Sequence, residues 1–177
     1  MSAARIYSTR VASTLTTVAL FLASSLYSSA AEPAVQVQLD SQHAGPRAVE
    51  NLTESGIIRD YRVAWASMAQ ALEFNTQDPL NGPFAGQAKH WLSETVTNQQ
   101  RSGLSQRYGD QNHKLEAVFY APEGDVIELH DTAEYQLQVL DGGKVVDDEP
   151  VVVHYVVLMT PGADRWVIRQ LQSVPQF

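Results

Sequence analysis

The chain has 177 residues, of which 12 are basic and 20 acidic, with a net charge of −8 and no cysteine. Its length and its 44% of hydrophobic residues predict one globular domain with a single core. The missing cysteine excludes disulfides, thiol catalysis, thiolate metal sites and a lipid-bearing N-terminal cysteine, and the acidic balance disfavours nucleic acid and anionic lipid as partners.

Residues 1–31 have the pattern of a secretory signal peptide. Arg5 and Arg10 precede an uncharged apolar stretch, 11–26, and a run of small residues follows it. Cleavage after Ala30 or Ala31 would leave 10 basic against 20 acidic residues, a net charge of −10. We expect an exported protein, periplasmic or secreted, without stable membrane insertion after cleavage. An uncleaved anchor is the alternative, although the stretch is shorter than the roughly 20 residues that span a bilayer.

Residues 32–50 are expected to form an N-terminal arm or linker. They contain two prolines and a glycine, which interrupt regular structure. A weak alternation of Val35, Val37 and Leu39 could add one strand to the edge of a sheet.

Two helices are predicted next. The first runs from Asn51 to about Asn75, with Asn51 and Glu54 spaced as an N-cap and its return partner. Pro83 is expected in the first turn of the second helix, which Gly103 ends. Apolar residues at spacings of three and four give each helix a buried face: Ile58, Tyr61, Trp65, Met68 and Leu72 in the first, Phe84, Ala88, Trp91, Leu92 and Val96 in the second.

The remainder of the chain is predicted to form four antiparallel strands, at 113–120, 126–140, 150–160 and 165–174. The second strand alternates strictly between apolar and polar residues, as a strand with one buried face does. The third strand is apolar on both faces except at His154. Helices can cover only one of those faces, so we expect a partner subunit or the arm to cover the other and predict a homodimer through the sheet.

Several segments resemble the nuclear transport factor 2-like superfamily, whose α+β domains pack helices in a curved sheet. The segments are Tyr61-x-x-x-Trp65, Gly-Pro-Phe-Ala-Gly before the second helix, the strand ending in Asp-Gly-Gly, His154-Tyr155 and Trp166-Val167-Ile168. The pattern is most like the non-catalytic branch that contains the C-terminal domain of a chloroplast-division protein. The resemblance implies an α+β cone over 51–177, with N-terminal helices in a curved four-stranded antiparallel sheet of the cystatin-like type. The superfamily includes both enzymes and binding domains, so the resemblance does not select a function.

Asp131 is the strongest candidate for chemistry, because the alternation places it on the apolar face of its strand. A carboxylate in an apolar cone would have a raised pKa and could act as a general base or a neutral donor. The structural alternative is a β-bulge at 131–132 that turns the side chain away from the core.

Other candidates are weighed against ordinary core roles. His154 could carry a proton to or from Asp131, or be a hydrogen-bonded core histidine at a dimer seam. Tyr61 or Tyr135 could hold a substrate oxygen. A ligand cavity could be lined by aromatic residues that would otherwise be core, namely Tyr61, Trp65, Trp91, Tyr120 and Trp166.

Two functions are therefore considered. The first is a non-catalytic extracytoplasmic binding or assembly domain that self-associates through its sheet and binds an unknown protein or small apolar ligand. The second is a small cofactor-free isomerase or dehydratase acting on an apolar substrate in the cone. The five histidines show no metal-ligand spacing, so neither a metal nor a cofactor is expected.

Overall fold

The structure, a computed structural model, describes residues 35–177, which form one compact α+β unit. Two helices pack on one face of a five-stranded sheet with the strand order β1-β2-β3-β4-β5. The elements are β1 (Gln36–Asp40), α1 (Asn51–Glu73), the 3-10 helix η1 (Asp78–Leu80), α2 (Gly86–Ser102), β2 (Leu104–Tyr120), β3 (Ile127–Asp141), β4 (Lys144–Pro161) and β5 (Trp166–Val174). The predicted leader lies outside the described residues.

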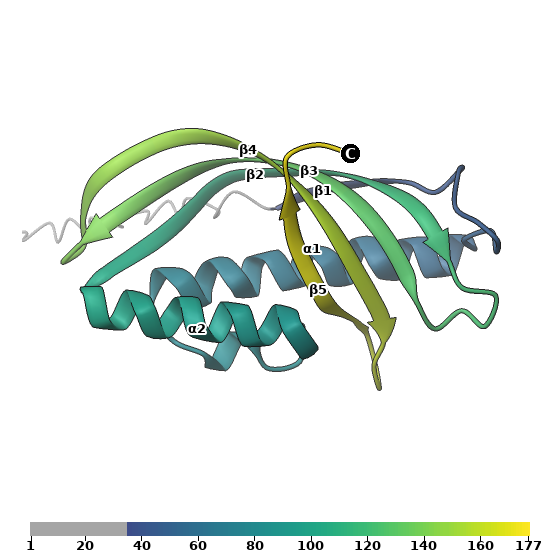
Figure 1. Cartoon of the computed structure of the whole chain (residues 1–177), viewed down its shortest axis with the longest axis horizontal. Coiled ribbons are helices and arrows are strands. Elements are labelled where there is room, and N and C mark those ends of the chain that lie inside the picture. Colours follow the sequence, from purple (N-terminus) through teal and green to yellow (C-terminus); the bar gives the residue numbers. More distant parts are fainter. Residues whose placement is uncertain (1–34) are drawn as a thin grey trace, which may run out of the picture. The chain divides into compact units, whose positions relative to one another are not determined.

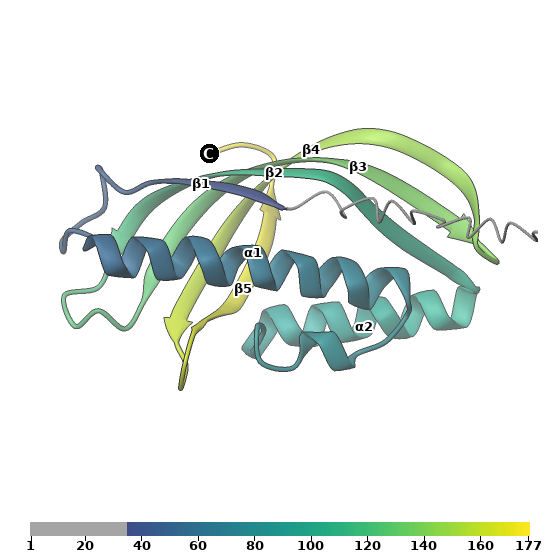
Figure 2. The same cartoon turned by 180° about the vertical axis from the view of Figure 1, so that it is seen from behind.

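The sheet curves over both helices, so it has a concave face toward the helices and a convex face away from them (Figure 1). β2 to β5 form the predicted antiparallel meander. β1 comes from the predicted arm and pairs parallel to β2, which makes the sheet five-stranded and mixed instead of four-stranded and antiparallel. Figure 2 shows β1 at the sheet edge beside α1.

The core lies between the concave face and α1. The inward residues of β3 alternate as predicted, with Ile127, Leu129 and Ala133 fully buried. From α1, Tyr61, Trp65 and Met68 are at most 2% exposed. The predicted helical stripe and strand alternation are therefore confirmed, because both put large apolar area against the same interior.

The starts of the two helices differ from the prediction. At α1 the cap residue is Glu50, without a side-chain cap bond, and Glu54 instead accepts a hydrogen bond from Ser41 Oγ at 2.8 Å. α2 begins at Gly86, so Pro83 precedes the helix. Pro83 O accepts a hydrogen bond from the backbone N–H of Ile168 at 3.0 Å. The segment predicted as the first turn of the helix therefore pairs with the edge of β5.

Two strands are longer than predicted. β2 begins at Leu104, and the first half of it pairs with the last residues of β3, with a register shift between Gly109 and Asn112. β4 begins at Lys144 and pairs with the same end of β3. These outer portions carry polar residues on both faces, so they lack the apolar alternation from which strands are predicted.

Candidate functional site

A buried polar cluster joins α1 to the centre of the sheet. Tyr61 OH donates to Asp131 Oδ2 at 2.7 Å, and His113 Nδ1 lies 2.8 Å from the same oxygen. The side chains come from α1, β3 and β2, and all three residues are 0% exposed. With the Nδ1–H tautomer of His113 as donor, one carboxylate oxygen accepts two buried hydrogen bonds.

The strand register explains why Asp131 points inward. Asp131 lies opposite Leu115 in β2 and Tyr155 in β4, and the pairing runs without interruption through Thr132. The bulge considered at 131–132 is therefore absent. Asp131 keeps the inward position that the alternation predicts, and a carboxylate without solvent contact needs such donors.

Trp65 closes the cluster from the helix side. Its ring centroid lies 4.2 Å from that of His113 and 6.3 Å from that of Tyr61. Three buried atoms around it have no hydrogen-bond partner among the described residues, namely Asp131 Oδ1, His113 Nε2 and Trp65 Nε1. A carboxylate, an imidazole and a phenol can exchange protons, but none of the grooves described below reaches them.

Burial raises the pKa of Tyr61 well above its usual range, and the negative charge of Asp131 and the hydrogen bond to it raise the pKa further. The phenol of Tyr61 therefore stays neutral and keeps its role as donor.

Tyr135 belongs to a separate group of tyrosines. Its hydroxyl lies 3.3 Å from that of Tyr155, and its ring centroid lies 5.0 Å from that of Tyr108. Burial is the main cause that raises the pKa of all three phenols. Tyr135 OH is thus bonded to another phenol and not to Asp131.

His154 lies on the opposite face of the sheet from Asp131. It pairs with Thr132, its Nδ1 is 3.2 Å from Thr132 Oγ1, and it is partly exposed on the convex face. His154 therefore does not exchange protons with Asp131 as predicted, and it does not lie in the core. His113 occupies that position, and it escaped the sequence analysis because only the β2–β3 register brings it near Asp131.

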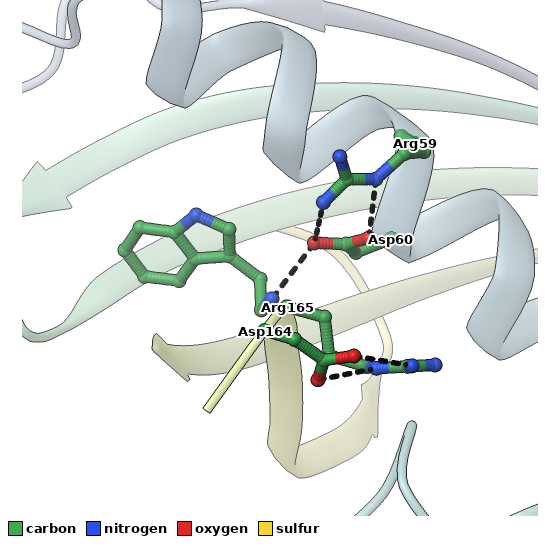
Figure 3. A network of polar contacts seen from close by, with 5 residues as sticks. Arg59, Asp60, Asp164 and Arg165 are labelled. Carbon is green, nitrogen blue, oxygen red and sulfur yellow. Dashed lines mark hydrogen bonds and ion pairs between the residues drawn. The ribbon is translucent and has the colours of Figure 1, made fainter. Parts of the chain in front are cut away.

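Trp166 and Tyr120 lie at another end of the core, with ring centroids 6.4 Å apart. The backbone N–H of Trp166 donates to Asp60 Oδ2 at 2.8 Å, and Arg59 binds the same carboxylate (Figure 3). Asp60 is only 6% exposed and ties α1 to the first residue of β5. The neighbouring Asp164–Arg165 pair in Figure 3 is a surface ion pair.

Trp91 is 46% exposed, so its predicted place on the buried face of α2 is wrong. The buried stripe of α2 runs through Ala88, Leu92 and Val96, and Trp91 flanks it. Trp91 instead lines a groove of about 350 Å³ between α2, Tyr155 of β4 and the C-terminal half of β5. The five predicted aromatic residues therefore do not share one cavity.

A second groove, of about 590 Å³, lies along the outer side of α1 beside Val35 and Tyr108, with Phe74 67% exposed at its rim. Within 35–177 no group of three histidine or carboxylate side chains could hold a metal ion. No helix in this part of the chain has the length and apolar character needed to cross a membrane.

No protein-family model matches the chain, and no curated protein sequence matches it. Among solved structures, the chain is similar to the intermembrane space region of chloroplast protein ARC6, with a TM-score of 0.59 and 13% sequence identity. The likeness covers 73% of this chain and 98% of that one. At this identity it shows a shared fold alone. It agrees with the predicted likeness to a chloroplast-division protein, while membership of the nuclear transport factor 2-like superfamily stays a prediction.

Proposed function

We propose that this protein is a non-catalytic extracytoplasmic binding and assembly domain that forms homodimers through the convex face of its sheet. The observation that carries the proposal is the apolar character of β4 on that face. Val152, Val156 and Leu158 alternate with the buried Tyr155 and Val157 in an uninterrupted register, so they point away from both helices, and Val152 is 65% exposed.

The neighbouring strand shows how unusual this is for an uncovered face. β3 turns polar residues outward there, among them Glu128, His130 and Thr132, as strands with one solvated face do. β4 instead turns Val152, Val156 and Leu158 outward, with His154 between them. The ring of Phe177 packs against His154 and stacks on His130, with ring centroids 4.9 Å and 4.2 Å apart. Contiguous apolar surface of this kind marks interaction sites, and a second copy of the same strip would cover it symmetrically.

The test is the molar mass of the cleaved chain, residues 32–177, measured by light scattering after size exclusion. We expect a dimer at micromolar concentration for the wild type and a monomer for Val152→Arg. The new cation would face Glu134, which lies opposite residue 152 in β3, so the fold should be retained.

Val146→Arg is the matched control, because residue 146 is 60% exposed on the same strand but lies near the hairpin tip. It should leave the dimer intact. A monomeric wild type throughout the micromolar range, or equal loss of mass in both variants, would remove the proposed self-association.

The extracytoplasmic location rests on the signal-peptide pattern of residues 1–31. Its test is the N-terminal residue of the protein recovered from the natural host. We expect Ala31 or Glu32; recovery of the intact leader in the cytoplasm would contradict export.

The acid/base alternative is supported by the convergence of Tyr61, His113 and Asp131. It requires a substrate to reach a carboxylate that is 0% exposed, and hence a movement of α1 away from the sheet. An isomerase or dehydratase activity that Asp131→Asn abolishes in a folded protein would favour this alternative over the binding domain.

A further inference from the structure

We propose that the groove beside Trp91 binds an extended cationic peptide: an apolar anchor residue enters the groove and Lys or Arg side chains face the acidic start of β4. This deepens the proposed function, because it rests on the domain being a binding module. It does not require self-association, since the groove lies on the helix side of the sheet.

The groove has the character of an anchor pocket. Its apolar lining is Ala88, Trp91, Tyr155 and Leu171, and the groove has no charged side chain. Trp91 is nearly half exposed although the other two described tryptophans are buried or partly buried. Concave sites with an aromatic wall and a few polar groups are the usual form of ligand pockets, and tryptophan is prominent among residues that dominate binding energy.

The edge of β5 next to the groove already accepts an extended segment. Ile168 N–H donates to Pro83 O at 3.0 Å, and Ala85 N–H donates to Ile168 O at 2.9 Å. Gly86, with φ of 56°, then brings its backbone against Arg169, where a Cβ would lie 3.2 Å from the carbonyl oxygen. There α2 begins and the chain leaves the edge.

From Gln170 to Val174 the outer edge of β5 has no backbone partner among the described residues. The groove opens beside this stretch, with Gln170 and Ser173 in its lining. A peptide strand placed there would continue the pairing that residues 83–85 begin, and its side chains would alternate toward Trp91. This continuity favours an extended peptide over a compact small molecule.

The acidic start of β4 supplies the charge preference. Asp147, Asp148 and Glu149 are exposed, and none forms an ion pair with a described residue. Asp147 and Glu149 lie opposite Val139 and Leu137 of β3 and so share the helix side of the sheet with Tyr155. Asp148 accepts hydrogen bonds from Gln136 and Gln138 and lies on the convex face. Glu149 lies six residues from Tyr155 along β4, about 20 Å in a strand, so basic residues should lie about six positions from the anchor.

The experiment selects binders of residues 32–177 from a random displayed peptide library. The peptides are about twelve residues long, which is enough to include both the apolar anchor and the basic residues. Selected peptides are then titrated by fluorescence anisotropy. We expect the selected peptides to share an aromatic or branched apolar residue, with Lys or Arg about six positions before or after it. Trp91→Ala should weaken their binding at least about tenfold. Replacing 147–149 by Asn-Asn-Gln should weaken binding at low salt and remove most of its salt dependence.

Phe74→Ala is the control, because Phe74 is a more exposed aromatic residue, which directly follows α1 and lies outside the groove. It should bind as the wild type does. Failure to enrich any peptide, or enrichment of peptides that Trp91→Ala does not affect, would overturn the site. Neutral peptides that need Trp91 would overturn the cationic assignment. Light scattering on the same samples tests self-association separately. A dimer that binds no peptide would contradict only the peptide site. A monomer that binds the peptides would contradict only the proposed dimer.

Discussion

Asp131 shows how one buried carboxylate can organise the interior of the domain. Its Oδ2 accepts from both Tyr61 and His113, so the residue joins three elements at a position without solvent. Such an acceptor stabilises the fold most when both donors are present, because removing the acceptor leaves two buried donors without hydrogen-bond partners.

Asp131→Ala should therefore lower the free energy of unfolding by about 3 kcal/mol or more, since each buried unsatisfied donor costs about 1–3 kcal/mol. Urea denaturation followed by circular dichroism measures the change. Asp148→Ala, on the exposed part of β4, should cost less than about 1 kcal/mol. Equal losses in the two variants would show that the cluster is not a stabilising network.

The buried tyrosines predict how stability depends on alkaline pH. Folding raises the pKa of Tyr61, Tyr108, Tyr135 and Tyr155 above the unfolded value. A group whose pKa is raised by folding contributes its full stability below the unfolded pKa of about 10 and loses it as the pH rises further. We expect the free energy of unfolding to fall above about pH 10, with tyrosinate absorbance rising together with unfolding. Titration of these phenols near their ordinary pKa in a folded protein would contradict their burial.

Among the elements, β4 differs between its exposed face and its exposed edge. Its convex face exposes Val152, Val156 and Leu158, but its free edge before β5 is protected. The Asp148 N–H donates to Asp147 Oδ1 at 3.0 Å, and Pro150, two positions on, has no N–H. Successive donors on one side of the strand are thus removed, which is how natural proteins prevent edge-to-edge pairing.

Asp147→Ala combined with Pro150→Val should restore those donors and increase aggregation. The measurement is light scattering over time at fixed concentration. Pro175→Val, beyond the end of β5, should behave as the wild type. No difference between the double variant and this control would show that the edge needs no protection.

The parts of the fold that the sequence predicts well are the helices and strands with one buried face and one exposed face. The alternation from Ile127 to Leu137 and the spacing of Tyr61 and Trp65 fix which sides are buried, and the structure agrees. Local patterns could not reveal His113, because its role depends on the β2–β3 register. They also misplaced Trp91, since a large aromatic residue one position from the buried stripe of α2 fits helical spacing almost as well.

At the scale of the whole molecule, the interior and the surface have different roles. The concave side is filled by α1, with Trp65 1% exposed, and Asp131 Oδ2 there binds both Tyr61 and His113. The surfaces that we propose for partners are the convex strip on β4 and the groove beside Trp91.

Site-specific cross-linking tests assembly through the convex face directly, and each introduced cysteine is the only thiol because the chain has no cysteine. Val152→Cys and Val146→Cys are compared in the cleaved chain with a short bismaleimide reagent at micromolar concentration. We expect a covalent dimer through residue 152 and far less through residue 146, since only residue 152 lies on the convex strip. A species that stays monomeric at 152, or cross-links equally well at 146, would contradict assembly through the convex face.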